Sequence, residues 1–93
     1  MERQTFANVW DALENTPAES ASMTMRSDLL IAVCHRVSTW NLAQPEASKR
    51  LDVTAPRLNE LLRGSINSFS LEELIDLARR AGLVVGLNIA EAA

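Results

Sequence analysis

Two groups of side chains in this 93-residue chain could do chemistry, but their spacing argues against catalysis. Cys34 and His35 could form a thiol–imidazole pair, yet adjacent positions on a helix do not face each other. Glu72, Glu73 and Asp76 could bind a metal, although acids in the first turn of a helix more commonly stabilise its dipole. The sequence also has no glycine-rich phosphate loop. We therefore expect no enzyme, no catalytic or metal site and no cofactor.

The basic side chains are unevenly distributed, which matters because charge acts over about 10 Å. The net charge of the whole chain is −3. Residues 1–25 carry one base and four acids, residues 26–67 carry six bases and four acids, and residues 68–93 carry two bases and four acids. The middle of the chain is therefore basic between acidic flanks, and it could bind nucleic acid although the whole chain is acidic.

The composition is that of one small globular domain. Hydrophobic residues make up 47% of the chain, but no apolar run approaches the ~20 residues that a membrane helix needs. The N-terminus lacks the apolar stretch of a signal peptide, and the single cysteine, Cys34, cannot close a disulfide within the chain. We expect a cytoplasmic protein without membrane contact.

The first 24 residues read as a separate N-terminal segment. Apolar residues at helical spacing, Phe6 and Trp10 among them, predict an amphipathic helix over residues 5–14. Thr16, followed by proline and then by Glu19, has the pattern of a capped helix start. Because serine and threonine residues follow closely, the helix that begins here is expected to be short.

Residues 25–82 form the predicted helical domain. Apolar stripes, capping residues and glycine stops predict helices over residues 25–40, 44–51, 55–62 and 71–81. The second and third helices are short and are joined by a tight turn, which is typical of a helix-turn-helix. Ala47 is small enough for the two helices to cross closely, and Val53 and Leu58 would fill the wedge between them.

The last segment, residues 83–93, changes from helical to alternating periodicity. Leu83, Val85, Leu87 and Ile89 alternate with smaller or polar residues, which predicts a β-strand. A single strand leaves its backbone groups unpaired, and the chain offers no second strand. The simplest partner is the same strand of another copy, so we expect Val84, Val85, Leu87 and Ile89 to form a dimer interface.

At the level of motifs, the segment 42–64 resembles the helix-turn-helix of the Cro/C1 (XRE) class of DNA-binding regulators. Residues 68–72 and the closing strand are similar to those of HigA-type antitoxins and their solitary XRE relatives. The resemblance implies a mostly α, lambda-repressor-like helix-turn-helix bundle whose C-terminal β-strand pairs across a homodimer. It also implies binding to double-stranded operator DNA.

The same resemblance assigns DNA contacts by position. Gln44, at the start of the first helix of the motif, is expected to contact a phosphate. Arg63 and Ser65 are expected to contact the DNA backbone at the far end of the second helix. The second helix, the recognition helix, carries Thr54, Ala55, Arg57, Asn59 and Glu60.

Three positions depart from the usual pattern of this class. Asp52 occupies the turn position that is usually glycine, but aspartate tolerates the left-handed conformation better than most residues. Ala43 removes a capping hydroxyl. Ala55 replaces the usual base-reading glutamine and offers only a methyl contact to thymine. Geometry and residue type then favour Arg57 as a reader of guanine, with Asn59 second.

Several residues have an alternative role. Arg57 could be a solvated arginine, and Arg63 could only stabilise the C-terminal dipole of its helix. Phe6 and Trp10 could dock on the body of the domain or bind a partner, and the sequence does not decide between these roles.

We interpret the chain as a DNA-binding antitoxin of a type II toxin–antitoxin system, which neutralises a RelE/HigB-like RNase toxin and represses its own operon. One alternative is a solitary XRE-family repressor without a toxin. Another is a protein-interaction module derived from a helix-turn-helix, which Ala55, Glu60 and the net charge of −3 would suit.

Overall fold

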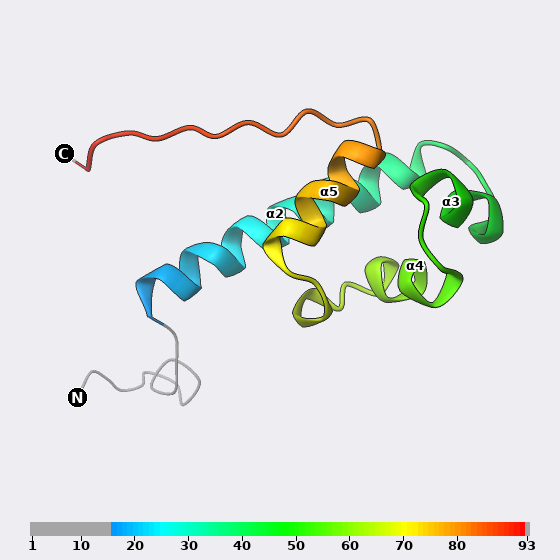
Figure 1. Cartoon of the computed structure of the whole chain (residues 1–93), viewed down its shortest axis with the longest axis horizontal. Coiled ribbons are helices and arrows are strands. Elements are labelled where there is room, and N and C mark those ends of the chain that lie inside the picture. The colour runs from blue at the N-terminus through cyan, green and yellow to red at the C-terminus, as the bar shows by residue number, and fades with distance from the viewer. Residues whose placement is uncertain (1–15, 93) are drawn as a thin grey trace.

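The structure, a computed structural model, describes residues 16–92 as four α-helices and one short 3-10 helix (Figure 1). The predicted helix over residues 5–14, with Phe6 and Trp10, lies outside the described residues. The elements are α2 (Pro17–Ser38), α3 (Gln44–Leu51), α4 (Ala55–Leu62), η1 (Ile66–Ser68) and α5 (Leu71–Arg80).

α2 is one continuous helix, so the expectation of a short helix followed by another from residue 25 is wrong. Its start is confirmed: Thr16 Oγ1 accepts the N–H of Glu19 at 3.0 Å, and the Glu19 carboxylate accepts the N–H of Thr16 at 2.9 Å. The hydroxyl residues do not end the helix because they bond within it. Thr24 Oγ1, for example, donates to the carbonyl of Ser20. The division predicted after residue 24 therefore falls inside α2.

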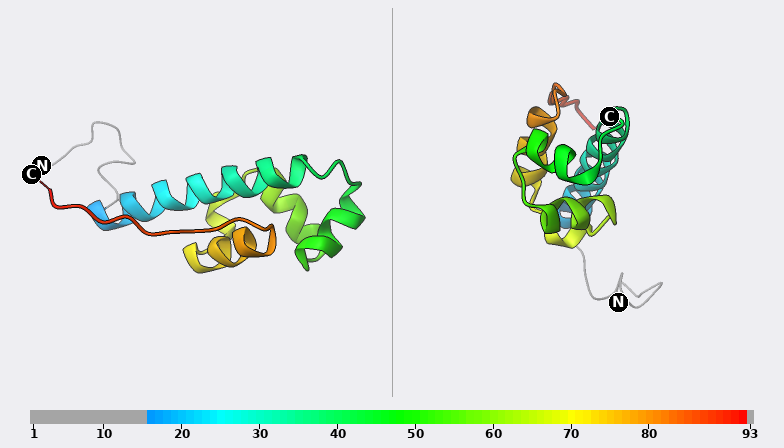
Figure 2. Two further views of the ribbon diagram at one scale, coloured as in Figure 1. Left: turned by 90° about the horizontal axis from the view of Figure 1, so that it is seen from above. Right: turned by 90° about the vertical axis from the view of Figure 1, so that its right-hand side faces the viewer.

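α2 and α5 lie side by side, and α3 and α4 close one end of the pair (Figures 1 and 2). All four helices contribute aliphatic side chains to a single core, as the scarcity of aromatic residues leads one to expect. No helix within residues 16–92 is long and apolar enough to cross a membrane. The buried apolar residues are Leu30, Val33, Val37, Ala47, Leu51, Leu58, Leu61, Phe69, Leu74, Leu77, Ala78 and Ala81.

The predicted stops of α4 and α5 are confirmed. Gly64 and Gly82 follow the two helices with φ values of 78° and 86°, in the left-handed region that favours glycine. The start of α5 is also as predicted, because Ser70 and Glu73 form a reciprocal capping box. These local signals fix the lengths of the two helices.

Residues 83–92 do not form the predicted β-strand, and the described part of the chain contains no strand. The segment is extended and runs back along α2 (Figure 2). The Leu83 N–H donates to the Ala78 carbonyl at 2.9 Å, but residues 84–92 make no backbone hydrogen bond to another described residue. A strand needs paired backbone groups, and this single chain offers the segment none.

Candidate nucleic-acid interface

α3 and α4 pack as the two helices of a helix-turn-helix. Ala47 of α3 is buried, with only 3% of its surface exposed, and Leu58 of α4 is completely buried. Val53, in the turn, is half-buried and packs against the core. The small residue at the crossing and the aliphatic wedge therefore do what the sequence predicts.

The turn between α3 and α4 depends on a left-handed residue and on a guanidinium from α5. Asp52 has φ 59° and ψ 50°, so the non-glycine residue is accommodated as predicted. Thr54 caps α4 by accepting the N–H of Arg57 at 3.2 Å. Arg80 donates from Nη1 to the carbonyls of Leu51, at 3.2 Å, and of Asp52, at 2.8 Å. Since these carbonyls end α3, Arg80 ties the turn to α5.

Sequence reasoning did not find this role of Arg80. A basic residue in the last turn of a helix is expected to stabilise that helix's own dipole, and Arg80 and Arg79 fit that expectation. The Arg80 guanidinium also pairs with Asp76, at 2.8 Å between Nη2 and Oδ2, which orients it toward the turn. Only the tertiary fold brings it to carbonyls 28 and 29 residues earlier in the chain.

The outward face of α4 carries a row of exposed side chains. At 3.6 residues per turn, Pro56, Asn59 and Arg63 lie within about 60° of one another, on the side opposite the buried Leu58 and Leu61. Asn59 offers both a donor and an acceptor, and Arg63 offers a fork of donors. Sequence reasoning missed Pro56, although a helical projection of α4 places it on this face.

Gln44 lies next to one edge of this face. It lines a hollow of about 340 Å³ together with Leu62 of α4 and Asn41 and Leu42 of the preceding loop. Ala43 provides no side-chain cap, as predicted, so the backbone N–H groups at the start of α3 have no capping side chain there. Gln44 and Leu62 of α4 therefore border the same hollow.

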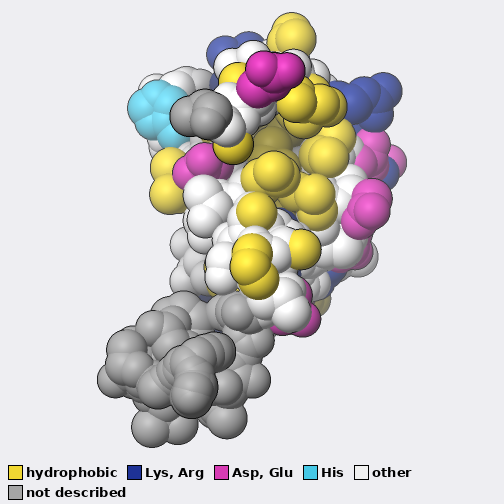
Figure 3. Space-filling view, turned by 90° about the vertical axis from the view of Figure 1, so that its left-hand side faces the viewer, with side chains coloured by type: hydrophobic (Ala, Val, Ile, Leu, Met, Phe, Trp, Pro, Cys, Tyr) yellow, Lys and Arg dark blue, Asp and Glu magenta, His cyan; other side chains and the backbone are white. Residues whose placement is uncertain are grey.

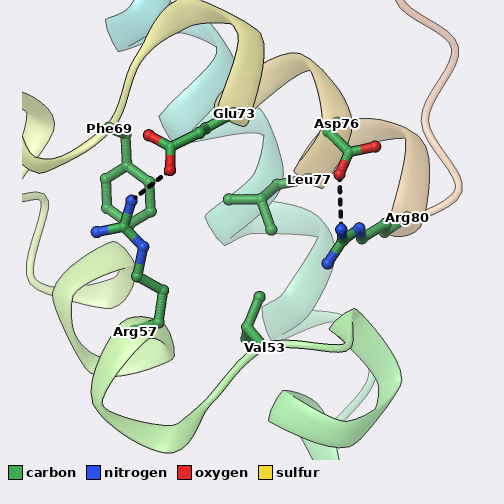
Figure 4. A pocket seen from close by; sticks show the side chains of 7 residues that line it. All are labelled: Val53, Arg57, Phe69, Glu73, Asp76, Leu77 and Arg80. Atoms are coloured by element: carbon green, nitrogen blue, oxygen red, sulfur yellow. Dashed lines mark hydrogen bonds and ion pairs between the residues drawn. The ribbon is translucent and has the colours of Figure 1, made fainter.

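Arg57 occupies a different position from the one predicted for a guanine reader. Its guanidinium is 3.9 Å from the centroid of the Phe69 ring, Nη1 donates to Glu60 at 2.9 Å, and Nη2 donates to Glu73 at 2.9 Å. Figure 4 shows the guanidinium over the ring and directed at α5. In this structure Arg57 is directed at its own protein, because two carboxylates and an aromatic face compete for its charge.

Glu73 accepts two hydrogen bonds in the cluster that it forms with Arg57, Glu60 and Phe69. One carboxylate oxygen accepts the N–H of Ser70 at 2.8 Å and completes the cap of α5, while the other accepts from Arg57. These bonds lower the pKa of Glu73, chiefly through the Ser70 N–H and then through Arg57. The pairing with Glu60 and Glu73 raises the pKa of Arg57. The cluster therefore links the cap of α5 to the first turn of α4.

The remaining predicted DNA contacts vary in exposure. Thr54 and Ala55 are exposed at the start of α4, whereas Glu60 and Ser65 are half-buried. Within residues 16–92, Arg63 and Lys49 form no ion pair, so their charges are not neutralised by the described acids. Arg63 therefore provides basic charge at the end of α4, whereas Arg57 is balanced by two acids.

The sequence model of one protein family, described as a helix-turn-helix domain, matches residues 12–90. The match covers most of the chain and includes the α3–turn–α4 motif. The chain belongs to this helix-turn-helix family. A search of curated proteins found no match. A helix-turn-helix domain suggests DNA-binding regulation, and the match extends through the extended segment that follows α5.

Two further kinds of chemistry considered from the sequence are a reactive thiol at Cys34 and a metal site. Cys34 is half-buried, its Sγ donates to the Leu61 carbonyl at 3.3 Å, and burial raises the pKa of the thiol. A raised pKa disfavours the nucleophilic thiolate. Among residues 16–92 no three His, Cys, Asp or Glu side chains are grouped so as to hold a metal ion.

The Arg57–Glu73 ion pair should couple α4 to α5 measurably. Arg57→Gln and Glu73→Gln are each expected to lower the free energy of unfolding by about 0.5–1 kcal/mol, and the double variant by less than the sum. Glutamine at position 73 retains an oxygen for the Ser70 N–H, so this variant isolates the ion pair. Urea denaturation at pH 7 measures all three, with Arg79→Gln, which removes an exposed pair with Asp76, as the control.

The same pair predicts a pH dependence. Because the pKa of Glu73 is lowered in the folded protein, its contribution is fully present above the ordinary value of 4.5 and is lost as the pH falls through the lowered pKa. The difference in stability between wild type and Glu73→Gln should therefore shrink at acidic pH. Additive losses in the double variant, or a difference that grows on acidification, would contradict the coupling.

Proposed function

We propose that this helix-turn-helix domain is a sequence-specific DNA-binding repressor that places α4 in the major groove. The observation that carries the proposal is the outward row Pro56–Asn59–Arg63, which is exposed on the side of α4 opposite the buried Leu58 and Leu61. A major groove about 12 Å wide admits one α-helix, and the outward face of that helix reads the base edges.

Asn59 is the best candidate for direct base recognition, since an amide can form two hydrogen bonds to adenine. Arg63 is the best candidate for guanine or for a phosphate at the C-terminal end of α4. Ala55 and Pro56 offer apolar contacts to thymine methyl groups. Arg57, the reader favoured by the sequence, takes second place because a DNA contact would have to displace Glu60, Glu73 and the Phe69 ring.

Phosphate contacts would come from the rim of the same surface. Gln44 and Thr54 stand at the exposed starts of α3 and α4, and Ser65 follows α4. Lys49 and Arg50 are exposed on α3, where Arg50 also lies 4.3 Å from the Trp40 ring centroid. With so few uncompensated bases, we expect a modest salt dependence per protomer.

The extended segment after α5 supports a homodimer. Its backbone groups beyond Leu83 are unpaired among the described residues, and Val84, Leu87 and Ile89 are 98%, 79% and 80% exposed. An unpaired apolar edge favours pairing with another chain. We propose that residues 83–89 of two copies pair as antiparallel strands, with Val85 in the same interface. Such a dimer would present two recognition helices to a palindromic operator.

The antitoxin role is a finer proposal that rests on the resemblance of residues 42–64 and 68–72 to HigA-type antitoxins. In this proposal the domain represses its own operon and neutralises a RelE/HigB-like toxin. A basic, RNA-directed toxin would suit the acidic flanks of the chain, namely residues 1–25 and 68–93. A solitary repressor differs only in lacking that partner.

The DNA-binding proposal predicts distinct effects of two substitutions on binding to the DNA upstream of the chain's own gene. Asn59→Ala should reduce discrimination against altered base pairs by about 1–3 kcal/mol. Arg63→Ala, if it contacts phosphate, should weaken binding to all sequences and reduce the salt slope by about 1. Fluorescence anisotropy over a salt series measures both, and Arg79→Ala on α5 is the matched control. No specific binding at low salt would favour a protein-interaction module.

The dimer proposal predicts that Leu87→Asp raises the dimer dissociation constant at least tenfold, because it places a charge in an apolar strand interface. Sedimentation equilibrium measures the constant. Ile31→Asp, at a position 65% exposed on α2, is the control and should leave it unchanged. A monomeric wild type would contradict the dimer. Equal effects of the two substitutions would mean that the interface lies elsewhere.

The antitoxin proposal predicts a neighbouring reading frame that encodes a small basic protein. That protein should arrest growth when expressed alone and should be harmless when co-expressed with this chain. Co-purification of the two untagged proteins would test their contact. If no such neighbour is encoded, or if this chain does not relieve its toxicity, the solitary repressor is the better description.

A further inference from the structure

An apolar groove lies at the end of the molecule where α2 begins, away from α3 and α4. It has a volume of about 480 Å³ and opens between α2, the first half of α5 and the extended C-terminal segment. Figure 3 shows hydrophobic side chains gathered on this end of the molecule. The apolar residues that line it are Met25, Leu29, Leu71, Ile75, Val85 and Leu87.

The groove continues along α2 beyond the point where α5 begins. Met25 is 47% exposed, and the next positions on the same helical face toward the N-terminus are Ala21 and Ala18, both exposed. Small residues on a helix face allow another helix to approach closely. The face from Ala18 to Leu29 therefore resembles a helix-packing site. Its side chains are small at Ala18 and Ala21, and the apolar groove lies at Met25 and Leu29.

A segment of matching pattern precedes α2 in the chain. Phe6, Val9, Trp10 and Leu13 fall on one face of a helix over residues 5–14, and Asp11 lies about 150° from the centre of that face. Only two residues separate this segment from Pro17, the first residue of α2. A short connection of this kind joins antiparallel helices.

The lengths of the two segments also agree. A ten-residue helix is about 15 Å long, and the rise along α2 from Pro17 to Arg26 is about 14 Å. An antiparallel helix that turns back after residue 14 brings Leu13 level with Ala18 and Phe6 level with Met25. Phe6 would then face Met25 at the edge of the groove, and Trp10 would face Ala21, one turn of α2 before it.

We propose that residues 5–14 of the same chain form a helix that packs antiparallel on the Ala18–Met25 face of α2, with Trp10 against Ala21 and Phe6 at the Met25 edge of the groove. Two buried aromatic side chains remove about 150–250 Å² each from water, which makes them strong anchors. The two-residue tether gives the chain's own segment a high effective concentration, so it is favoured over a second copy or a separate partner. The proposal is independent of DNA binding, and it rests on Met25, Leu29, Leu71 and Ile75, which take no part in the strand pairing proposed for residues 83–89.

Trp10 fluorescence tests the docking directly in the full chain carrying Trp40→Phe. The emission of Trp10 should be blue-shifted relative to free tryptophan, and a hundredfold dilution should not change it. Ile75→Asp, in the groove, should shift the emission to the red, whereas Ile31→Asp, at the exposed position used above, should not. Red emission at every concentration overturns the proposal, and blue emission that is lost on dilution overturns it in favour of a second copy.

A second measurement applies even if Ile75→Asp does not fold. In a Cys34→Ser background, cysteines introduced at Val9 and Ser22 should oxidise to a disulfide within one chain, because antiparallel packing brings these positions level. Pairing between chains, or no pairing, contradicts the arrangement. Phe6→Ser together with Trp10→Ser should also lower Tm by roughly 4–8 °C, and an unchanged Tm counts against docking. DNA affinity should be measured on the same variants. If docking fails while DNA affinity is retained, only the docking proposal is contradicted.

Discussion

α4 is too short to be a helix on its own, and this constraint governs the rest of the structure. Isolated helices of eight residues are unstable in water, so α4 exists because its neighbours hold it. Leu58 and Leu61 are buried in the core, Thr54 caps the first turn, and Gly64 closes the last. The buried face of α4 fixes, by helical geometry alone, which side chains remain to meet a ligand.

Arg57 adds a second constraint on α4, besides the burial of its leucines and the caps at its two ends. It lies between the buried and the outward faces of α4 and reaches across to Phe69 and Glu73. The resulting contact restrains rotation of α4 about its own axis, which burial of two leucines alone restrains less well. A charge that looks like a DNA contact in the sequence therefore serves, in the structure, to orient the residues beside it.

Much of the fold could be predicted from the sequence, because the signals are local. The capping boxes at Thr16 and Ser70, the left-handed Asp52 and the glycine at position 64 each depend on residues within one turn. The length of α2 was mispredicted because Thr24 satisfies its hydroxyl inside the helix, which composition does not show.

The candidate site was less predictable, since its decisive contacts join distant parts of the chain. Glu73 is 16 residues from Arg57, and no spacing rule links them. Arg80 reaches the turn from another helix in the same way. The strand predicted over residues 83–89 is absent from the single chain for a related reason: alternation produces a strand only where a pairing edge exists.

Arg80 also helps to make the end of α5 a junction of the α3–α4 turn and α2. Its guanidinium holds the carbonyls of the α3–α4 turn, and one residue later the Ala81 carbonyl accepts a hydrogen bond from Arg36 of α2 at 3.0 Å. The extended segment leaves the fold directly after these two anchors. The tail and the turn before the recognition helix are therefore held at the same end of α5, within two residues of each other along the chain.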